Sequence, residues 1–251
     1  MIIKRQADTI RESSYGVAAE LLASFPVGKP VLIKPNIVEP SPPPVTTDVR
    51  VVAGIVSALK DRGISDIIIA EGSGTGDTMD NFRSLGYASL GVKLVDLDRE
   101  ETVTLPVKHF RVWQEITVPA ILLSRFIISV PALKEHSLCG VTVSLKNMVG
   151  VLPARLYSGY WSYKKSQIHK YDTHGCIADL VSIVPPAMSI VDASVGLKEH
   201  HLSGSPADPA LNMIYGSPDA LEADIFGCGL IGRKWKDITY LRMVAEDKKR
   251  G

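Results

Sequence analysis

The sequence predicts a single α/β domain, residues 1–251, built on a mostly parallel, twisted sheet with helices on both faces. Short apolar runs of strand length, rich in β-branched residues, alternate along the chain with segments of helical periodicity. The composition agrees, because a chain of 251 residues with 45% hydrophobic and 22% charged residues can bury a substantial core. We see no internal repeat and no low-complexity tail.

The first elements follow in a regular order. A helix is expected within residues 8–25, where apolar residues recur at helical spacing and Asp8 or Thr9 can act as the N-cap. The run VLIK then predicts a strand at 31–34. The second helix begins after Asp48, a good N-cap residue, and ends near Gly63, a typical C-terminal residue. IIIA, residues 67–70, predicts another buried strand.

Four further apolar runs have strand length, and helix signals lie between several of them: VKLVDL, FIISV, MSIV and LNMIY. This order is typical of a Rossmann-like, three-layer arrangement. The proline cluster EPSPPPV, residues 39–45, predicts a stiff loop. Residues 153–173 lack clean periodicity, and we interpret them as a lid or an excursion from the domain.

Charge and cysteine content exclude several classes of protein. Lys and Arg number 28 against 27 Asp and Glu, so the net charge of +1 favours neither nucleic acid nor an acidic membrane surface. The three cysteines are far apart and form no C-x-x-C pair, which argues against disulfides and favours a reducing compartment. No signal-peptide core or membrane span is apparent, so we expect a cytoplasmic protein.

Polar motifs follow four of the predicted strands: KPN after VLI, EGSGTGD after IIIA, PALKEH after FIISV, and DASVG after MSIV. In open α/β sheets, ligands bind in a crevice at the carboxyl ends of the strands, where loops and free backbone donors converge. We therefore expect these motifs to line one crevice.

The stretch PALKEHSLCGVTVSLKNMVG, residues 131–150, concentrates the most polar chemistry. Lys134, His136, Lys146 and Asn147 lie within 14 residues in an otherwise apolar and small segment. Two ammonium groups, an imidazole and an amide would suit a carboxylate or a phosphate. The alternative is that the lysines only pair with acids such as Glu135 or Glu71.

The glycine-rich stretch EGSGTGD is the second candidate. Gly72, Ser73 and Gly74 lie between a strand and a helix expected to begin at Asp77 or Thr78, so a ligand could approach the backbone there. The motif is neither a Walker A sequence nor a dinucleotide fingerprint, and a tight turn without a ligand explains it equally well. Glu71 is the best candidate for a general base or metal ligand, unless a neighbouring lysine pairs with it.

The KPN motif and the strand-end Asp192 complete the candidate ligand contacts. We expect Pro35 to hold the backbone extended, with Lys34 and Asn36 on opposite sides, and we favour Asn36 as the contact. Thr46 or Thr47 would add a hydroxyl group.

No metal can be assigned from spacing. The six histidines include no H-E-x-x-H or comparable motif, and the cluster formed by His169, Asp172 and His174 is better explained as a surface loop. A metal held by His136, Glu71 and Asp192 is compatible with the predicted strand order but has no spacing signature.

Several segments resemble, in order, the conserved prokaryotic family called domain of unknown function 362. They are KPNIV, the pair Thr46 and Thr47, EGSG, the Gly86–Tyr87 pair, residues 131–150, IVDASVG and DALEAD, over roughly residues 30–232. The resemblance implies no particular activity. Many relatives of this kind carry a cysteine-rich, ferredoxin-like iron-sulfur segment. This chain has no such cysteines, so we expect no built-in iron-sulfur cluster, and other cofactors stay unassigned.

The sequence thus favours an enzyme that acts on a small anionic metabolite. Lys134 and Lys146 would neutralise the anion, and His136, Glu71 or Lys134 would take part in catalysis. The competing hypothesis is a non-catalytic protein that binds an anion or a partner in the same pocket, for example a redox or iron-sulfur protein.

Overall fold

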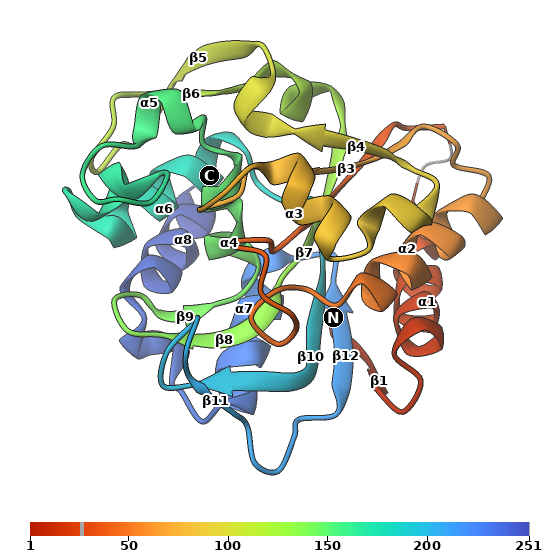
Figure 1. Cartoon of the computed structure of the whole chain (residues 1–251). Coiled ribbons are helices and arrows are strands. Elements are labelled where there is room, and N and C mark those ends of the chain that lie inside the picture. Colours follow the sequence, from red (N-terminus) through yellow and green to blue (C-terminus); the bar gives the residue numbers. More distant parts are fainter. Residues whose placement is uncertain (26–27, 251) are drawn as a thin grey trace.

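The structure, a computed structural model, describes residues 1–25 and 28–250 and has a mixed, mostly parallel sheet at its centre (Figure 1). The strands of its main path lie in the order β1 (Ile3–Gln6), β12 (Met213–Ser217), β10 (Met188–Lys198), β7 (Phe126–Val130), β2 (Val31–Pro35), β3 (Ile67–Glu71) and β4 (Lys93–Asp96). The pairs from β10 to β4 are parallel, whereas β12 runs antiparallel to both β10 and β1. The α/β class and the mostly parallel sheet are therefore confirmed.

Five further strands lie outside this main path in the described residues. They are β8 (Ala132–His136), β9 (Gly140–Thr142) and β11 (Ser205–Pro206), which extend the main sheet, and the separate antiparallel pair β5 (Thr102–Pro106) and β6 (Glu115–Pro119). The predicted strands at VLIK, IIIA, VKLVDL, FIISV, MSIV and LNMIY are all present. The MSIV strand is longer than expected, because β10 runs on to Lys198 alongside β8.

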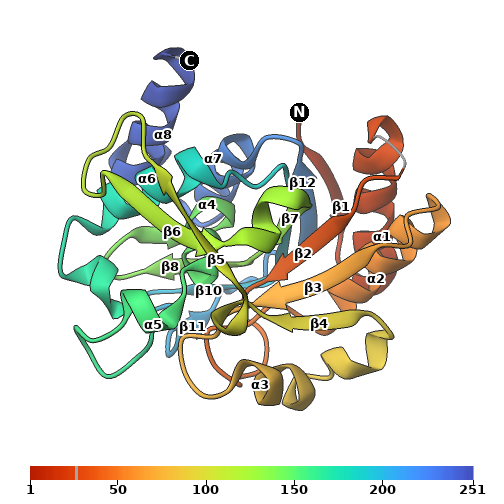
Figure 2. The same cartoon turned by 90° about the horizontal axis from the view of Figure 1, so that it is seen from above.

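Helices lie on either side of this sheet in both views (Figures 1 and 2). On one side are α1 (Ile10–Leu21) and α2 (Val49–Asp61); on the other are α4 (Ser144–Asn147), α6 (Thr173–Ile183), α7 (Ala220–Leu230) and α8 (Thr239–Arg250). Two buried clusters follow from the side-chain alternation of the strands: Val31 and Ile33 belong to the α1–α2 cluster, and Leu32 belongs to the other.

The remaining helical segments are short: α3 (Thr78–Ser84), α5 (Ala154–Tyr157), η1 (Leu22–Ser24), η2 (Tyr87–Leu90), η3 (Leu97–Arg99), η4 (Ala120–Ser124), η5 (Met148–Val151), η6 (Ser166–His169) and η7 (Trp235–Asp237). The proposed excursion, residues 153–173, contains α5 and η6 and no strand. In the described part of the chain, no helix is both long enough and apolar enough for a membrane crossing.

Local signals explain where the second helix begins and ends. The Asp48 carboxylate accepts a hydrogen bond from the Arg50 backbone N–H at 2.8 Å, as an N-cap residue does. At the other end, Gly63 has a φ of 80°, and the N–H of Ile64 donates to the Leu59 carbonyl. Thr9 has the N-cap position of α1, but its side chain makes no capping bond.

We expect Asp48→Ala to lower the free energy of unfolding by about 1 kcal/mol, because the first turn of α2 loses its side-chain acceptor. Asp48→Asn keeps an acceptor at that place and should cost clearly less. Urea unfolding of the two variants measures the difference. Equal losses for Ala and Asn would show that the carboxylate acts through its charge rather than as a cap.

Candidate functional site

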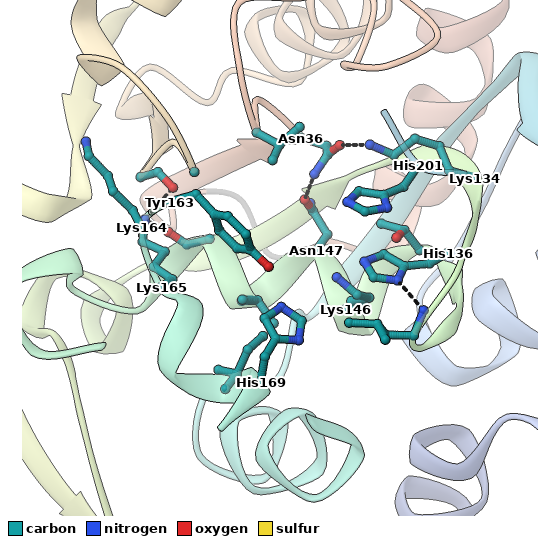
Figure 3. A pocket seen from close by; sticks show the side chains of 18 residues that line it. Asn36, Lys134, His136, Lys146, Asn147, Tyr163, Lys164, Lys165, His169 and His201 are labelled. Atoms are coloured by element: carbon teal, nitrogen blue, oxygen red, sulfur yellow. Dashed lines mark hydrogen bonds between the residues drawn. The ribbon is translucent and has the colours of Figure 1, made fainter. Parts of the chain in front are cut away.

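A pocket of about 130 Å³ lies at the carboxyl ends of β2 and β3 (Figure 3). This volume corresponds to on the order of ten water molecules, enough for a small metabolite. The strand register explains its place: Pro35 at the end of β2 pairs with Val130 at the end of β7, and β3 ends at Glu71 beside them. The walls come from the loops after these strands, from β8 and α4, and from residues 163–169 of the excursion.

The lining of the pocket is strongly basic. Its ionisable side chains are Lys134, Lys146, Lys164, Lys165, His136, His169, His201 and Tyr163. No Asp or Glu side chain belongs to the lining among the residues that the structure describes. Polar uncharged groups come from Asn36, Asn147 and Thr142. A cavity with this composition favours an anion, because its own groups supply positive charge and N–H donors without a competing carboxylate.

Lys134 lies on β8, a strand that was not among those predicted from the sequence. The strand forms because β10 continues past the end of β7 and offers its backbone to Ala132 and Lys134. The ammonium group, 1% exposed, donates to Asn36 Oδ1 at 2.8 Å and to the Val45 carbonyl at 2.7 Å. Burial, followed by the charge of Lys146, lowers the pKa of Lys134 to about 7. Its charge can therefore change near neutral pH.

Lys146 and Asn147 lie on α4, directly beneath the pocket. The half-buried Lys146 makes no hydrogen bond or ion pair within the described part of the chain, and burial lowers its pKa. The Asn147 side chain is fully engaged. Its Oδ1 accepts from Asn36 Nδ2 at 3.1 Å, and its Nδ2 donates to the Lys34 carbonyl and to Ser129 Oγ.

His136 is held in one protonation state by its surroundings. Its Nδ1 accepts from the backbone N–H groups of Leu138 and Cys139 at 3.2 and 3.3 Å, so the proton of the neutral ring is on Nε2. Burial, then Lys146, lowers the pKa of His136 far below its ordinary value. The ring stacks on His201 with 3.9 Å between centroids. At neutral pH, His136 is therefore an uncharged N–H donor.

Two polar atoms of the lining have no hydrogen-bond partner in residues 1–25 and 28–250. They are Thr142 Oγ1 and His201 Nδ1, both buried. Buried polar atoms are normally paired, and each unpaired one costs about 1–3 kcal/mol.

Glu71 lies behind the pocket rather than in it. Its carboxylate pairs with Lys34 Nζ at 2.8 Å and accepts the N–H groups of Ile37 and Gly72 at 3.1 and 2.9 Å. Both side chains of the pair are almost completely buried. The alternative of a salt bridge to a neighbouring lysine is thus the arrangement observed for Glu71. A side chain at Gly150 would collide with this carboxylate, so glycine is needed there.

The expectation that Lys34 and Asn36 point to opposite sides is wrong. Residues two apart along an extended segment share a face, and both side chains reach Asn147 Oδ1, at 3.4 and 3.1 Å. They differ in depth, because Asn36 lines the pocket and Lys34 lies below it.

Several residues expected at the ligand have structural partners instead. Thr46 Oγ1 donates to the Ser41 carbonyl, and Thr47 Oγ1 donates to the Val130 carbonyl. Asp192 accepts from the Asp48 N–H and from Ser194. None of the three lines the pocket, and neither does Ser73, whereas Gly72 and Gly74 do.

The structure does not assemble the metal site considered from the sequence. No group of three His, Cys, Asp or Glu side chains suited to a metal occurs within residues 1–25 and 28–250. His136 lines the pocket, Glu71 pairs with Lys34, and Asp192 binds backbone and Ser194.

The excursion supplies pocket residues that the sequence interpretation missed: Tyr163, Lys164, Lys165, Ile168 and His169. Lys165 anchors it, since its buried Nζ donates to the Gly72 and Gly150 carbonyls and pairs with Asp98 at 3.2 Å. Burial lowers the pKa of His169 to about 4. His201, whose pKa burial lowers to about 3, was also missed. For the excursion, the only signal in the sequence was its composition, which is rich in Tyr and Lys and has no periodicity. For His201, it was the adjacent pair of His200 and His201.

Comparison with known proteins gives one match. A family model described as "Domain of unknown function (DUF362)" matches residues 31–229. Neither a search of curated proteins nor one of solved structures finds a significant match to the chain.

Proposed function

The chain belongs to the domain of unknown function 362 family, and we propose that it is an enzyme acting on a small carboxylate or phosphate anion in the pocket described above. The observation that carries the proposal is the unbalanced charge of the lining. Four lysines converge on the cavity, together with three histidines whose lowered pKa values leave them uncharged at neutral pH. The part of the chain that the structure describes contributes no carboxylate to the lining, and Asp98 pairs with Lys165 from outside it. The chain as a whole has a net charge of only +1, so this imbalance is local.

The proposed roles follow from the contacts. Lys134 and Lys146 supply the positive charge for the anion, and the His136 Nε2–H and the Thr142 hydroxyl supply further donors. Lys134 is the group best suited to move a proton, since its pKa of about 7 lets both forms exist at neutral pH. Glu71 is less suited than the sequence suggested, because its carboxylate neutralises Lys34.

A second candidate function is non-catalytic binding of an anion or of a protein partner. The rim favours it, because several large apolar side chains are exposed near the pocket: Leu138, Tyr160, Trp161 and Tyr163. Such side chains are common at interaction sites. Turnover of a bound anion would favour the enzyme, and binding without turnover would favour the partner protein.

The Rossmann-like arrangement and the cytoplasmic location are also part of the proposal. Two buried clusters on opposite faces of the sheet support a Rossmann-like, three-layer arrangement. Three free, buried cysteines support a reducing, cytoplasmic location.

We expect sulfate to stabilise the protein by about 2.7 kcal/mol at a concentration one hundred times its Kd. Sulfate is chosen because its charge is constant near neutral pH. The affinity should be highest below pH 7 and fall by up to about tenfold per pH unit above it, as Lys134 loses its proton. Thermal melts from pH 6 to 9 measure both effects, with chloride at equal ionic strength as the control. An identical response to sulfate and chloride would contradict an anion site.

The same lysine predicts the pH dependence of the free protein. Its pKa is lowered on folding from the ordinary lysine value of 10.5 to about 7, so between these values the unfolded chain binds more protons. The contribution of Lys134 to stability therefore increases as pH rises from 7 to 10.5 and is constant below 7.

A further inference from the structure

Lys146 differs from the other lysines in and beneath the pocket. The others have defined partners: Lys34 pairs with Glu71, Lys134 donates to Asn36 and Val45, Lys164 donates to the Gly76 carbonyl, and Lys165 pairs with Asp98. Lys146 Nζ has no partner within residues 1–25 and 28–250, although its side chain is half-buried in the cavity wall. Figure 3 shows it between His136 and His169.

The surroundings of Lys146 disfavour its ammonium form. Lys146 shares the pocket lining with His136, His169, His201 and Lys134. Burial lowers the pKa of these four groups, and the positive charge of Lys146 lowers it further. No carboxylate of the described lining balances this charge. An amine desolvated beside another cationic group is nucleophilic, because a larger fraction of it carries a free electron pair.

We propose that Lys146 forms an imine with a carbonyl group of the bound anion, whose charged end is held by Lys134. The ligand class is then a small carboxylate that also contains an aldehyde or ketone, the simplest case being a 2-oxo acid. This inference rests on the proposed function, since the anion must first occupy the pocket. Lys134, which has defined partners, holds the charged end of the ligand. The unpartnered Lys146 helps to attract the anion in its ammonium form and reacts through the fraction that is neutral.

The step balances without an oxidant or reductant. The Lys146 electron pair forms a bond to the carbonyl carbon, and the carbonyl π electrons move to oxygen, which takes up a proton. The nitrogen gives up its two protons in all, and the oxygen takes up a second one. The C–O bond then breaks, water leaves with that electron pair, and the nitrogen electron pair forms the C=N bond. The neutral His136, with its proton on Nε2, is placed in the same lining to donate a hydrogen bond to that oxygen.

Reductive trapping tests the proposal. The intact protein is incubated with pyruvate and sodium borohydride, which reduces an imine to a stable amine, and the product is analysed by intact mass and peptide mapping. We expect one reduced adduct on the peptide that contains Lys146. Lys146→Arg keeps the positive charge but removes the nucleophile, so the adduct yield should fall about tenfold or more while pyruvate still raises the Tm.

The outcomes separate this inference from the proposed function. A pyruvate-induced rise in Tm without an adduct on Lys146 overturns the imine and leaves anion binding intact. Neither a rise nor an adduct overturns both. Adducts spread over surface lysines at equal yield in the wild type and Lys146→Met also overturn the imine. If a variant fails to fold, peptide mapping of the wild type decides alone.

Discussion

Lys34→Met is expected to lower the free energy of unfolding by about 3–5 kcal/mol. The substitution removes the ammonium group that lies 2.8 Å from the Glu71 carboxylate, with both side chains almost fully buried. Glu71 keeps the N–H groups of Ile37 and Gly72, but these do not cancel a full charge in a desolvated place. Urea unfolding at neutral pH measures the loss.

Two comparisons show whether the stranded charge is the cause. Lys34→Met combined with Glu71→Leu removes both charges and should recover much of the loss. Arg83→Met breaks an exposed pair with Asp80 and should cost less than about 1 kcal/mol. A loss for Lys34→Met no larger than that for Arg83→Met would contradict the buried pair. If the double variant does not regain stability, the loss of unfolding free energy in Lys34→Met comes from altered packing rather than from the unpaired charge.

Lys134→Met is expected to weaken sulfate binding by about 1.5–3 kcal/mol, or about ten- to 150-fold. The change keeps most of the apolar stem and removes the charge that faces the anion. It should also flatten the decline of affinity above pH 7, because the pKa of Lys134 lies near 7. Isothermal titration of both proteins at pH 6 and 8 measures the two effects.

The fold should tolerate this change better than Lys34→Met. Lys134 pairs with no acid in the structure, so its removal strands only two acceptors, Asn36 Oδ1 and the Val45 carbonyl. The matched control is Lys164→Met, because Lys164 belongs to the same lining but is one-third exposed and bonded to a backbone carbonyl. Its effect on affinity should stay below about 1 kcal/mol. A Tm loss for Lys134→Met as large as that of Lys34→Met, with an unchanged sulfate response, would identify Lys134 as a structural residue.

Local sequence determined the framework of this protein. The runs at 31–34, 67–70 and 126–130 are continuous and β-branched, so local sequence predicts buried strands there, and strands form at all three. Asp48 and Gly63 bound α2 for reasons that lie within a few residues of each. The position of polar residues after strands also located the pocket, because parallel strands bring their carboxyl ends to one edge.

The tertiary structure decided which polar residues face the cavity. Thr46, Thr47 and Asp192 follow the same local rules as Asn36, yet their partners are backbone groups and side chains brought in by the fold. The strand β8 depends on the length of β10, which lies more than fifty residues later. The excursion reaches the pocket through the contacts of Lys165 with Gly72 and Asp98. These contacts could not be predicted from the sequence, because the segment has no helical or strand periodicity.

The lysines show the physical reason most clearly. The sequence shows that Lys34, Lys134 and Lys146 lie near the ends of buried segments. It does not show whether a carboxylate pairs with each ammonium group. Whether an ammonium group is neutralised depends on the atoms within a few ångströms, and those come from distant parts of the chain, such as Glu71 for Lys34. Local patterns therefore determined the strands and the edge at which the pocket forms. Long-range packing determined that Lys34 pairs with Glu71 while Lys134 and Lys146 face the cavity.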